Sequence, residues 1–191
     1  MALSRNILAA MAALMLAALV VLLSSSGIAT AEASACKRWG HDNPAKLSHG
    51  EARQAVMCLI DKKRHSHGKS GLDRDRRLQR AAQNHTEYMK SHSCFSHECS
   101  GEKSILGRLQ AVNYITGSLS RWAYGENIVS GEDRRGTPSA VVDAWMHSAP
   151  HRANILSGTF RDVGIGFVEG TPSSPKGDGG TYTADFGLRS G

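Results

Sequence analysis

One segment decides the fold of this chain: residues 145–156, which read Trp145-Met146-His147-Ser148-Ala149-Pro150-His151-Arg152-Ala153-Asn154-Ile155-Leu156. Three shorter segments accompany it, and they are Cys94-Phe95-Ser96-His97, Tyr124-Gly125-Glu126-Asn127-Ile128 and Tyr182-Thr183-Ala184-Asp185-Phe186-Gly187. Each of these short motifs alone would be weak evidence for a particular fold. The four in this order form a specific pattern that contains two histidines and one glutamate.

His151 follows Pro150 near the start of a predicted short helix that ends at Leu156, with Ser148 or Ala149 as its N-cap. The positive end of a helix disfavours the imidazolium form, so we expect a neutral His151 that can donate or coordinate. A lone histidine at such a place is usually an exposed surface residue. The same holds for His97. Either histidine becomes a candidate site residue only if it lies next to Glu126.

Glu126 is the residue that stands out without any comparison. In a strand, the period of two places it on the face shared by Trp122, Tyr124 and Ile128. A carboxylate on an apolar face is costly unless a cation or a hydrogen-bond donor meets it. The alternative is a bulge at Gly125 that turns Glu126 towards solvent. A carboxylate facing inwards can orient a histidine ring and raise its basicity.

The four segments resemble the CAP superfamily of cysteine-rich secretory, antigen-5 and pathogenesis-related-1 proteins, and in particular its bacterial secreted branch. The likeness extends from about Ser48 to Gly187. It implies an α-β-α sandwich and one cleft built by His97, Glu126 and His151. Many eukaryotic members carry a second glutamate three residues after the tryptophan, where this chain has Ser148. That departure weakens any mechanism that needs a second carboxylate.

The N-terminus has the anatomy of a secretory signal peptide. Arg5 precedes an apolar run from Ile7 to Leu23, and small residues follow up to Ala35. We expect cleavage after Ala31 or Ala35, with a membrane anchor as the alternative. The predicted organisation is a signal peptide over 1–35, a disulfide-tethered segment over 36–47 and a CAP domain over 48–191, secreted or associated with the cell surface.

Four cysteines in an exported chain predict two disulfides. The sequence alone allows three connectivities of Cys36, Cys58, Cys94 and Cys99. Because Cys94 and Cys99 enclose only four residues, we pair them with each other and Cys36 with Cys58. Such a short loop contributes little through unfolded-state entropy, and its use would be to hold the backbone that carries His97. The rival interpretation is a metal site in which both thiolates act with His97.

Helical and strand patterns alternate along the chain. A capping box at Ser48 opens one helix, and Asp73 or Asp75 caps a second whose apolar stripe includes His85 and His92. Shorter helices start near Ile105 and at Thr137-Pro138. Strands are predicted around 122–128, 163–168 and 182–186, and the last two should pair as an antiparallel hairpin. The fold class is α+β, which the resemblance sharpens to a three-layer sandwich around a mainly antiparallel sheet.

The formal net charge is +6, with clusters at Lys62-Lys63-Arg64 and at residues 74–80 that resemble solvated helix faces. No pattern of basic and aromatic residues supports nucleic-acid binding. The expected protein is a monomer with no membrane span after cleavage of the signal peptide.

Three functional classes remain. The favoured class is a secreted binding module for a small ligand, a lipid or a cell-envelope component. The second is a hydrolase in which a divalent metal such as zinc, bound by His97 and His151, activates water beside Glu126. Two histidines are fewer than the three protein ligands that a catalytic zinc ion usually has. The sequence also contains no serine-hydrolase elbow, zincin motif or P-loop, so an enzyme is disfavoured. The third is a structural extracellular domain without a ligand.

Overall fold

The computed structural model describes residues 36–191. The predicted signal peptide over 1–35 lies outside the described residues. Within 36–191, no helix has both the length and the apolar content that a membrane crossing needs. Cys36 is bonded to Cys58, so the segment over 36–47, which contains the 3₁₀ helix η1 (Pro44–Lys46), is attached to the rest by a disulfide.

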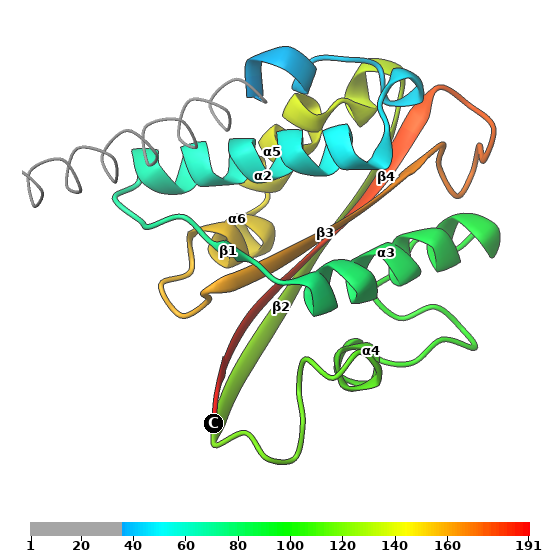
Figure 1. Ribbon diagram of the computed structural model, residues 1–191. Helices are drawn as coiled ribbons and strands as arrows, with labels where there is room; N and C mark the ends of the chain where they lie inside the picture. The colour runs from blue at the N-terminus through cyan, green and yellow to red at the C-terminus, as the bar shows by residue number, and fades with distance from the viewer. Residues whose placement is uncertain (1–35) are drawn as a thin grey trace, which may run out of the picture. The chain divides into compact units, whose positions relative to one another are not determined.

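A four-stranded sheet forms the central layer (Figure 1). Its order is β1 (Asp73–Arg74), β3 (Asp162–Glu169), β4 (Gly179–Ser190) and β2 (Arg121–Glu132). The pairs β3–β4 and β2–β4 are antiparallel, and only the short β1 runs parallel to its neighbour β3. The predicted hairpin of the last two strands and the mainly antiparallel sheet are confirmed.

Three helices cover one face of the sheet, and these are α2 (His49–Ser66), α5 (Pro138–His147) and α6 (Ala149–Leu156). Ser48 and Glu51 form the predicted capping box of α2. The hydroxyl of Thr137 accepts a hydrogen bond from the third residue of α5, and Pro138 begins that helix. The 3₁₀ helix η2 (Asp133–Gly136) connects β2 to α5. The main core lies between these helices and one side of β3 and β4.

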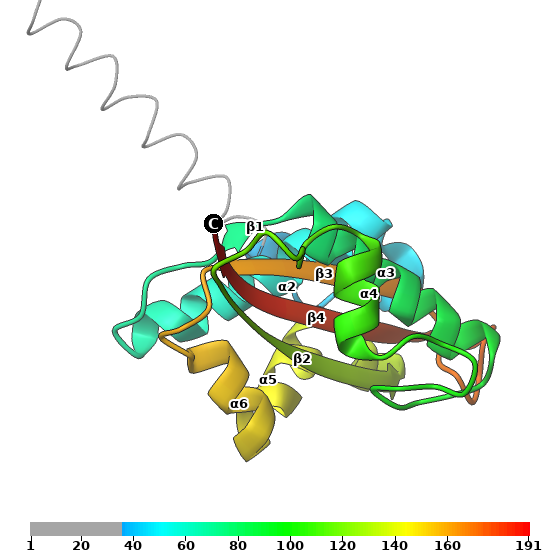
Figure 2. The same ribbon diagram turned by 90° about the horizontal axis from the view of Figure 1, so that it is seen from below.

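The opposite face is covered by α3 (Arg76–Ser91) and by α4 (Ile105–Ala111), which lies in front of the sheet in Figure 2. Asp75, one of the two predicted residues, caps α3. Glycines on β3 allow this helix to approach closely, because a Cβ at Gly164 would overlap the backbone nitrogen of Gln79. Close packing of α3 on the sheet is what encloses the polar residues described below.

Two sequence interpretations are wrong at the level of burial. His92 is exposed at the end of α3, where its ring stacks on Tyr88, and it is therefore not part of the core. Arg64 is buried rather than solvated, because its guanidinium donates to the backbone carbonyls of Ser70, Ile155 and Ser157. Those carbonyls lie where other segments approach the end of α2, which a pattern confined to that helix does not reveal.

Candidate functional site

Glu126 lies in the middle of β2 and faces the layer formed by α3 and α4. Its partner in the neighbouring strand β4 is Asp185. The Glu126 side chain has no exposed surface, and Ile128 on the same face of β2 packs against Met89 of α3. The alternative in which a bulge turns Glu126 towards solvent is therefore wrong. The strand delivers a carboxylate into a buried environment, where it needs charged or hydrogen-bonding partners.

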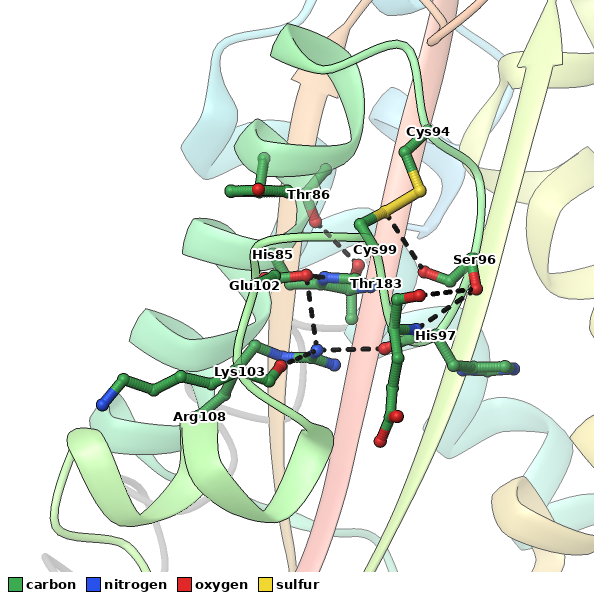
Figure 3. Close-up of polar contacts among 12 residues, drawn as sticks. His85, Thr86, Cys94, Ser96, His97, Cys99, Glu102, Lys103, Arg108 and Thr183 are labelled. Atoms are coloured by element: carbon green, nitrogen blue, oxygen red, sulfur yellow. Dashed lines mark hydrogen bonds and ion pairs between the residues drawn. A yellow bond between two sulfur atoms is a disulfide. The ribbon is translucent and has the colours of Figure 1, made fainter.

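His97 is one of these partners, and it lies on the loop closed by the Cys94–Cys99 disulfide (Figure 3). Its Nδ1 is 2.7 Å from Oε1 of Glu126. The His97 side chain is 45% exposed, so one edge of the ring contacts the buried carboxylate while the rest reaches solvent. Both predicted disulfide pairings are present, which excludes the rival site of two free thiolates.

Arg108 of α4 is the second partner, and no sequence signal identified it. Its Nη2 lies 2.6 Å from Oε2 of Glu126, and both side chains are buried. Its Nη1 donates to the backbone carbonyls of His97 and Lys103. Arg108 therefore binds the carboxylate and also the backbone of the loop that carries His97, so one side chain determines the relative position of both.

His85 of α3 takes a larger part than the packing role expected from the sequence. It is fully buried, and its Nδ1 lies 2.8 Å from Oε2 of Glu102 (Figure 3). Its Nε2 is 3.9 Å from Oε1 of Glu126. Burial lowers the pKa of His85 and outweighs the opposite effect of the two carboxylates. Neutral His85 thus lies between two acidic side chains.

Asp185 contributes a further carboxyl group next to Glu126. Burial, and then the nearby charge of Glu126, raise the pKa of Asp185 well above its usual range. As acceptors, its two carboxyl oxygens meet no hydrogen-bond donor among the described residues, whereas the protonated form can donate to Glu126. A second acid therefore exists at this site, although it comes from β4 and not from the position of Ser148. Sequence reasoning missed it, since the alternation of β4 marks Asp185 only as the polar side of a strand.

His151 comes from α6. The side-chain nitrogen of Asn127, the neighbour of Glu126 in β2, donates to the backbone carbonyl of His151 at 3.0 Å. Burial and then the nearby positive charge of His97 lower the pKa of His151. The direction agrees with the expected neutral ring, although its causes are burial and His97. No hydrogen bond joins the His151 ring to Glu126 within residues 36–191, so its membership of the cleft stays a prediction.

The protonation of the central pair follows from its contacts. The hydrogen bond that His97 donates to Glu126 raises the pKa of His97, and this exceeds the opposing effect of partial burial. Burial alone would raise the pKa of Glu126, but the hydrogen bond of His97 and the charge of Arg108 lower it. Glu126 is thus ionised at neutral pH, and His97 is a half-exposed ring that takes up a proton more readily than a free histidine.

The donor set does not make up an ordinary zinc site. Zinc in proteins generally has at least three protein ligands. In the described part of the chain, no group of three or more histidine, cysteine, aspartate or glutamate side chains is placed to bind one metal ion. His97 also uses Nδ1 for Glu126, which leaves Nε2 as its ligand atom. A metal here would have at most the two predicted histidines.

Comparison with known proteins identifies the family. Residues 57–183 match the sequence profile of the CAP group, described as the cysteine-rich secretory protein family. This chain belongs to that family. The CAP protein is 32% identical over 126 residues to the uncharacterized protein YkwD of Bacillus subtilis, a match that covers 66% of this chain and 45% of YkwD. The uncharacterized membrane protein YlbC of the same organism is 28% identical to this chain over 129 residues, and the match covers 65% of this chain and 34% of YlbC. The chain thus spans less than half the length of these relatives.

Solved structures agree on the fold. The SCP-domain extracellular protein of Bacillus anthracis has a TM-score of 0.57 at 24% identity, with 73% of this chain and 43% of that protein covered. An outer surface protein of Borrelia burgdorferi has a TM-score of 0.61 at 17% identity, and the match covers 75% of this chain and 97% of that protein. The expected α+β sandwich of the CAP family is thereby confirmed.

Proposed function

We propose that this CAP protein is a secreted or cell-surface binding module, and that the cleft of His97, Glu126 and His151 binds a small ligand, a lipid headgroup or another cell-envelope component. The hydrogen bond between His97 and Glu126 carries the proposal. A buried, ionised carboxylate orients a half-exposed imidazole, and a disulfide closes the loop on which that imidazole lies. A structural network alone does not require the ring to reach solvent.

The chemistry of His97 suggests which groups it would bind. Glu126 orients the ring and Arg108 holds the backbone carbonyl of His97, so little conformational entropy is lost when a ligand arrives. The raised pKa favours the imidazolium form, which donates a charge-assisted hydrogen bond. A phosphate, a carboxylate or a polarised carbonyl oxygen would accept it. The family relatives described as an extracellular protein and an outer surface protein support an extracellular place for this activity.

A thermal-shift screen of small phosphates, carboxylates and short-chain lipids would test this function. A ligand of the cleft should raise the melting temperature of the wild-type protein but not that of His97→Ala. His67→Ala is the matched control, because His67 is an exposed histidine at the end of α2. It should respond as the wild type does. A protein with no response to any compound would favour the structural-domain alternative.

The second candidate is the metal-dependent hydrolase. One observation favours it: a carboxylate bound to Nδ1 of a histidine is the usual support of a metal ligand, since it orients the ring and raises its basicity. The number of ligands speaks against it, as two histidines fall short of a catalytic zinc site. If an ion binds, Nε2 of His97 and the ring of His151 would hold it, and the ion would supply Lewis-acid chemistry. This candidate is tested by the zinc titration in the Discussion.

A further inference from the structure

A second recess lies beside the His97 loop and is not part of the site above. It is an open groove with a volume of about 740 Å³. One wall comes from Ser93 and Phe95, the other from the 171–173 loop, and the end of β2 with Arg135 of η2 completes it. The groove is therefore built by three segments that are far apart in the sequence. Hydroxyl groups, one aromatic ring and charged side chains line it together.

Phe95 is the unusual member of this lining. It is 52% exposed, and Trp122 is the only other large apolar side chain that is similarly exposed in the described part of the chain. Single exposed apolar side chains are common on protein surfaces, and Phe95 differs because it lines a groove together with hydroxyl and charged side chains. The disulfide between Cys94 and Cys99 closes this loop. The ring is thus presented on a short, constrained segment.

The hydroxyls of the groove can both donate and accept hydrogen bonds. Thr181 donates its hydroxyl proton to the Gly170 carbonyl, so Ser130 Oγ is the donor to Thr181 Oγ1 at 3.3 Å and can still accept from a ligand. Ser173 Oγ lies 3.1 Å from the buried Thr171 Oγ1, and in this pair either oxygen can be the donor. Such groups adapt to partners that also carry hydroxyls. The guanidinium of Arg135 adds further donors to this lining.

The groove and the cleft share one wall. The alternation of β2 places Glu126, Ile128 and Ser130 on the same face. Ile128 and Cys99 belong to one apolar cluster, so the disulfide loop lies against this stretch of β2. From that loop, His97 contacts Glu126 and Phe95 lines the groove together with Ser130. An extended ligand in the groove would therefore lead towards His97.

An extended peptide is the less suitable occupant. Peptides that bind along a strand need free backbone groups at the sheet edge, and β2 is an edge strand. Along this edge, however, the carbonyl of Ile128 accepts from the Trp145 indole and the carbonyl of Glu126 accepts from Asn154. The 3₁₀ helix η2 follows directly after Glu132. Little of the edge remains for strand addition, so recognition must use side chains.

We propose that this groove binds a linear glycan, whose sugar rings stack on Phe95 and whose hydroxyls pair with Ser130, Ser173 and Arg135. The inference rests on the proposed binding function and names the ligand class of the adjoining surface. A sugar ring offers an apolar face for an aromatic side chain and hydroxyls for polar groups at its rim. The groove presents both partners side by side.

Isothermal titration calorimetry with the purified protein tests the glycan site. The probes are a linear hexamer of N-acetylglucosamine, a linear hexamer of galacturonic acid and an extended hexapeptide of glycine and serine. At least one glycan should bind, and Phe95→Ala should weaken its binding by about tenfold. Trp122→Ala is the matched control, because it removes the other exposed aromatic and does not line the groove. This variant should bind as the wild type does.

The remaining outcomes would overturn the inference. These are no binding of either hexamer, equal binding by wild type and Phe95→Ala, equal losses in Phe95→Ala and Trp122→Ala, or a preference for the peptide. Because Phe95 is exposed, Phe95→Ala should keep its melting temperature, which checks that the variant is folded. His97→Ala should retain the glycan while losing the small ligand of the cleft. A failure of the groove and a failure of the proposed cleft are therefore distinguishable.

Discussion

Arg108 and Glu126 form a buried ion pair on which the position of the exposed His97 depends. The two side chains meet at 2.6 Å, and Arg108 also donates to the His97 backbone carbonyl at 3.0 Å. Glu126 in turn contacts the His97 ring. Arg108 thus fixes the backbone of this histidine and Glu126 fixes its ring, and the two residues are themselves joined by an ion pair.

Glu126→Gln should destabilise the protein and change the titration of His97. The substitution leaves the buried Arg108 without its nearest carboxylate, and breaking a buried pair on one side costs about 3 kcal/mol or more. Without the carboxylate, the pKa of His97 should fall back towards its ordinary value. Denaturant unfolding gives the first quantity and a proton NMR titration the second. Glu98→Gln, an exposed neighbour of His97, is the control and should have much smaller effects. Equal effects of the two substitutions would contradict the role of Glu126.

The stability supplied by the His97–Glu126 contact should decrease as the pH rises. The folded-state pKa of His97 lies above the unfolded value near 6.5, so the folded protein binds the proton more tightly. The contribution is complete below about pH 6.5 and disappears as the pH rises through the folded pKa. Since His97 is half exposed, solvent screening limits the contribution to less than about 1 kcal/mol.

The measurement compares the free energy of unfolding of wild type and His97→Asn from pH 5.5 to pH 9. The difference between the two proteins isolates His97 from the other titrating groups. It should be largest at the acidic end and diminish above pH 6.5. Parallel curves over the whole range would show that the contact adds no proton-linked stability.

Removal of the Cys94–Cys99 disulfide should affect the site more than the fold. A loop of this length stabilises by about 2 kcal/mol in the chain-entropy account, against about 3 kcal/mol for the longer Cys36–Cys58 loop. The double serine variant of Cys94 and Cys99 should therefore stay folded while the NMR signal of His97 shifts or broadens. The double serine variant of Cys36 and Cys58 should lose more stability and leave the His97 signal in place. The reverse pattern would exclude a positioning role for the short loop.

Gly164→Ala should be among the more destabilising single-methyl substitutions in this chain. The added Cβ would meet the backbone of α3 at Gln79, which cannot move without displacing the helix from the sheet. Overpacking of this kind costs about 3 kcal/mol. Gly158→Ala is the matched control, because nothing lies within 4 Å of its added Cβ. Its unfolding free energy should change by less than about 0.5 kcal/mol. Similar values for both variants would mean that α3 does not pack as described.

A zinc titration divides the metal-binding and metal-free interpretations. Histidines must be neutral to bind zinc, and the raised pKa of His97 makes its proton a stronger competitor at low pH. Zinc should therefore raise the melting temperature modestly at pH 7.5 and not at pH 5.5. His151→Ala should abolish the shift, whereas His147→Ala, an exposed histidine on α5, should retain it. The absence of a shift at both pH values would reject the metal site.

Much of the fold follows from local sequence signals. The capping box at Ser48 and the proline after Thr137 mark helix starts because they satisfy or remove the unpaired amides of a first turn. The alternation around Glu126 indicates its face because strand geometry has a period of two. The disulfide pairs follow from the spacing of the cysteines. These features depend on neighbours in the chain and can be predicted from it.

The sequence by itself thus determined the elements, the family and the carboxylate that needs a partner. Only the tertiary structure decided which partners it has. Arg108, His85 and Asp185 come from α4, α3 and β4, and none has a local pattern that points towards Glu126. They meet because α3 and α4 pack on the same face of the sheet, and burial there strengthens each electrostatic contact. The roles of these residues follow from contacts between distant segments, which helical and strand periodicity do not encode.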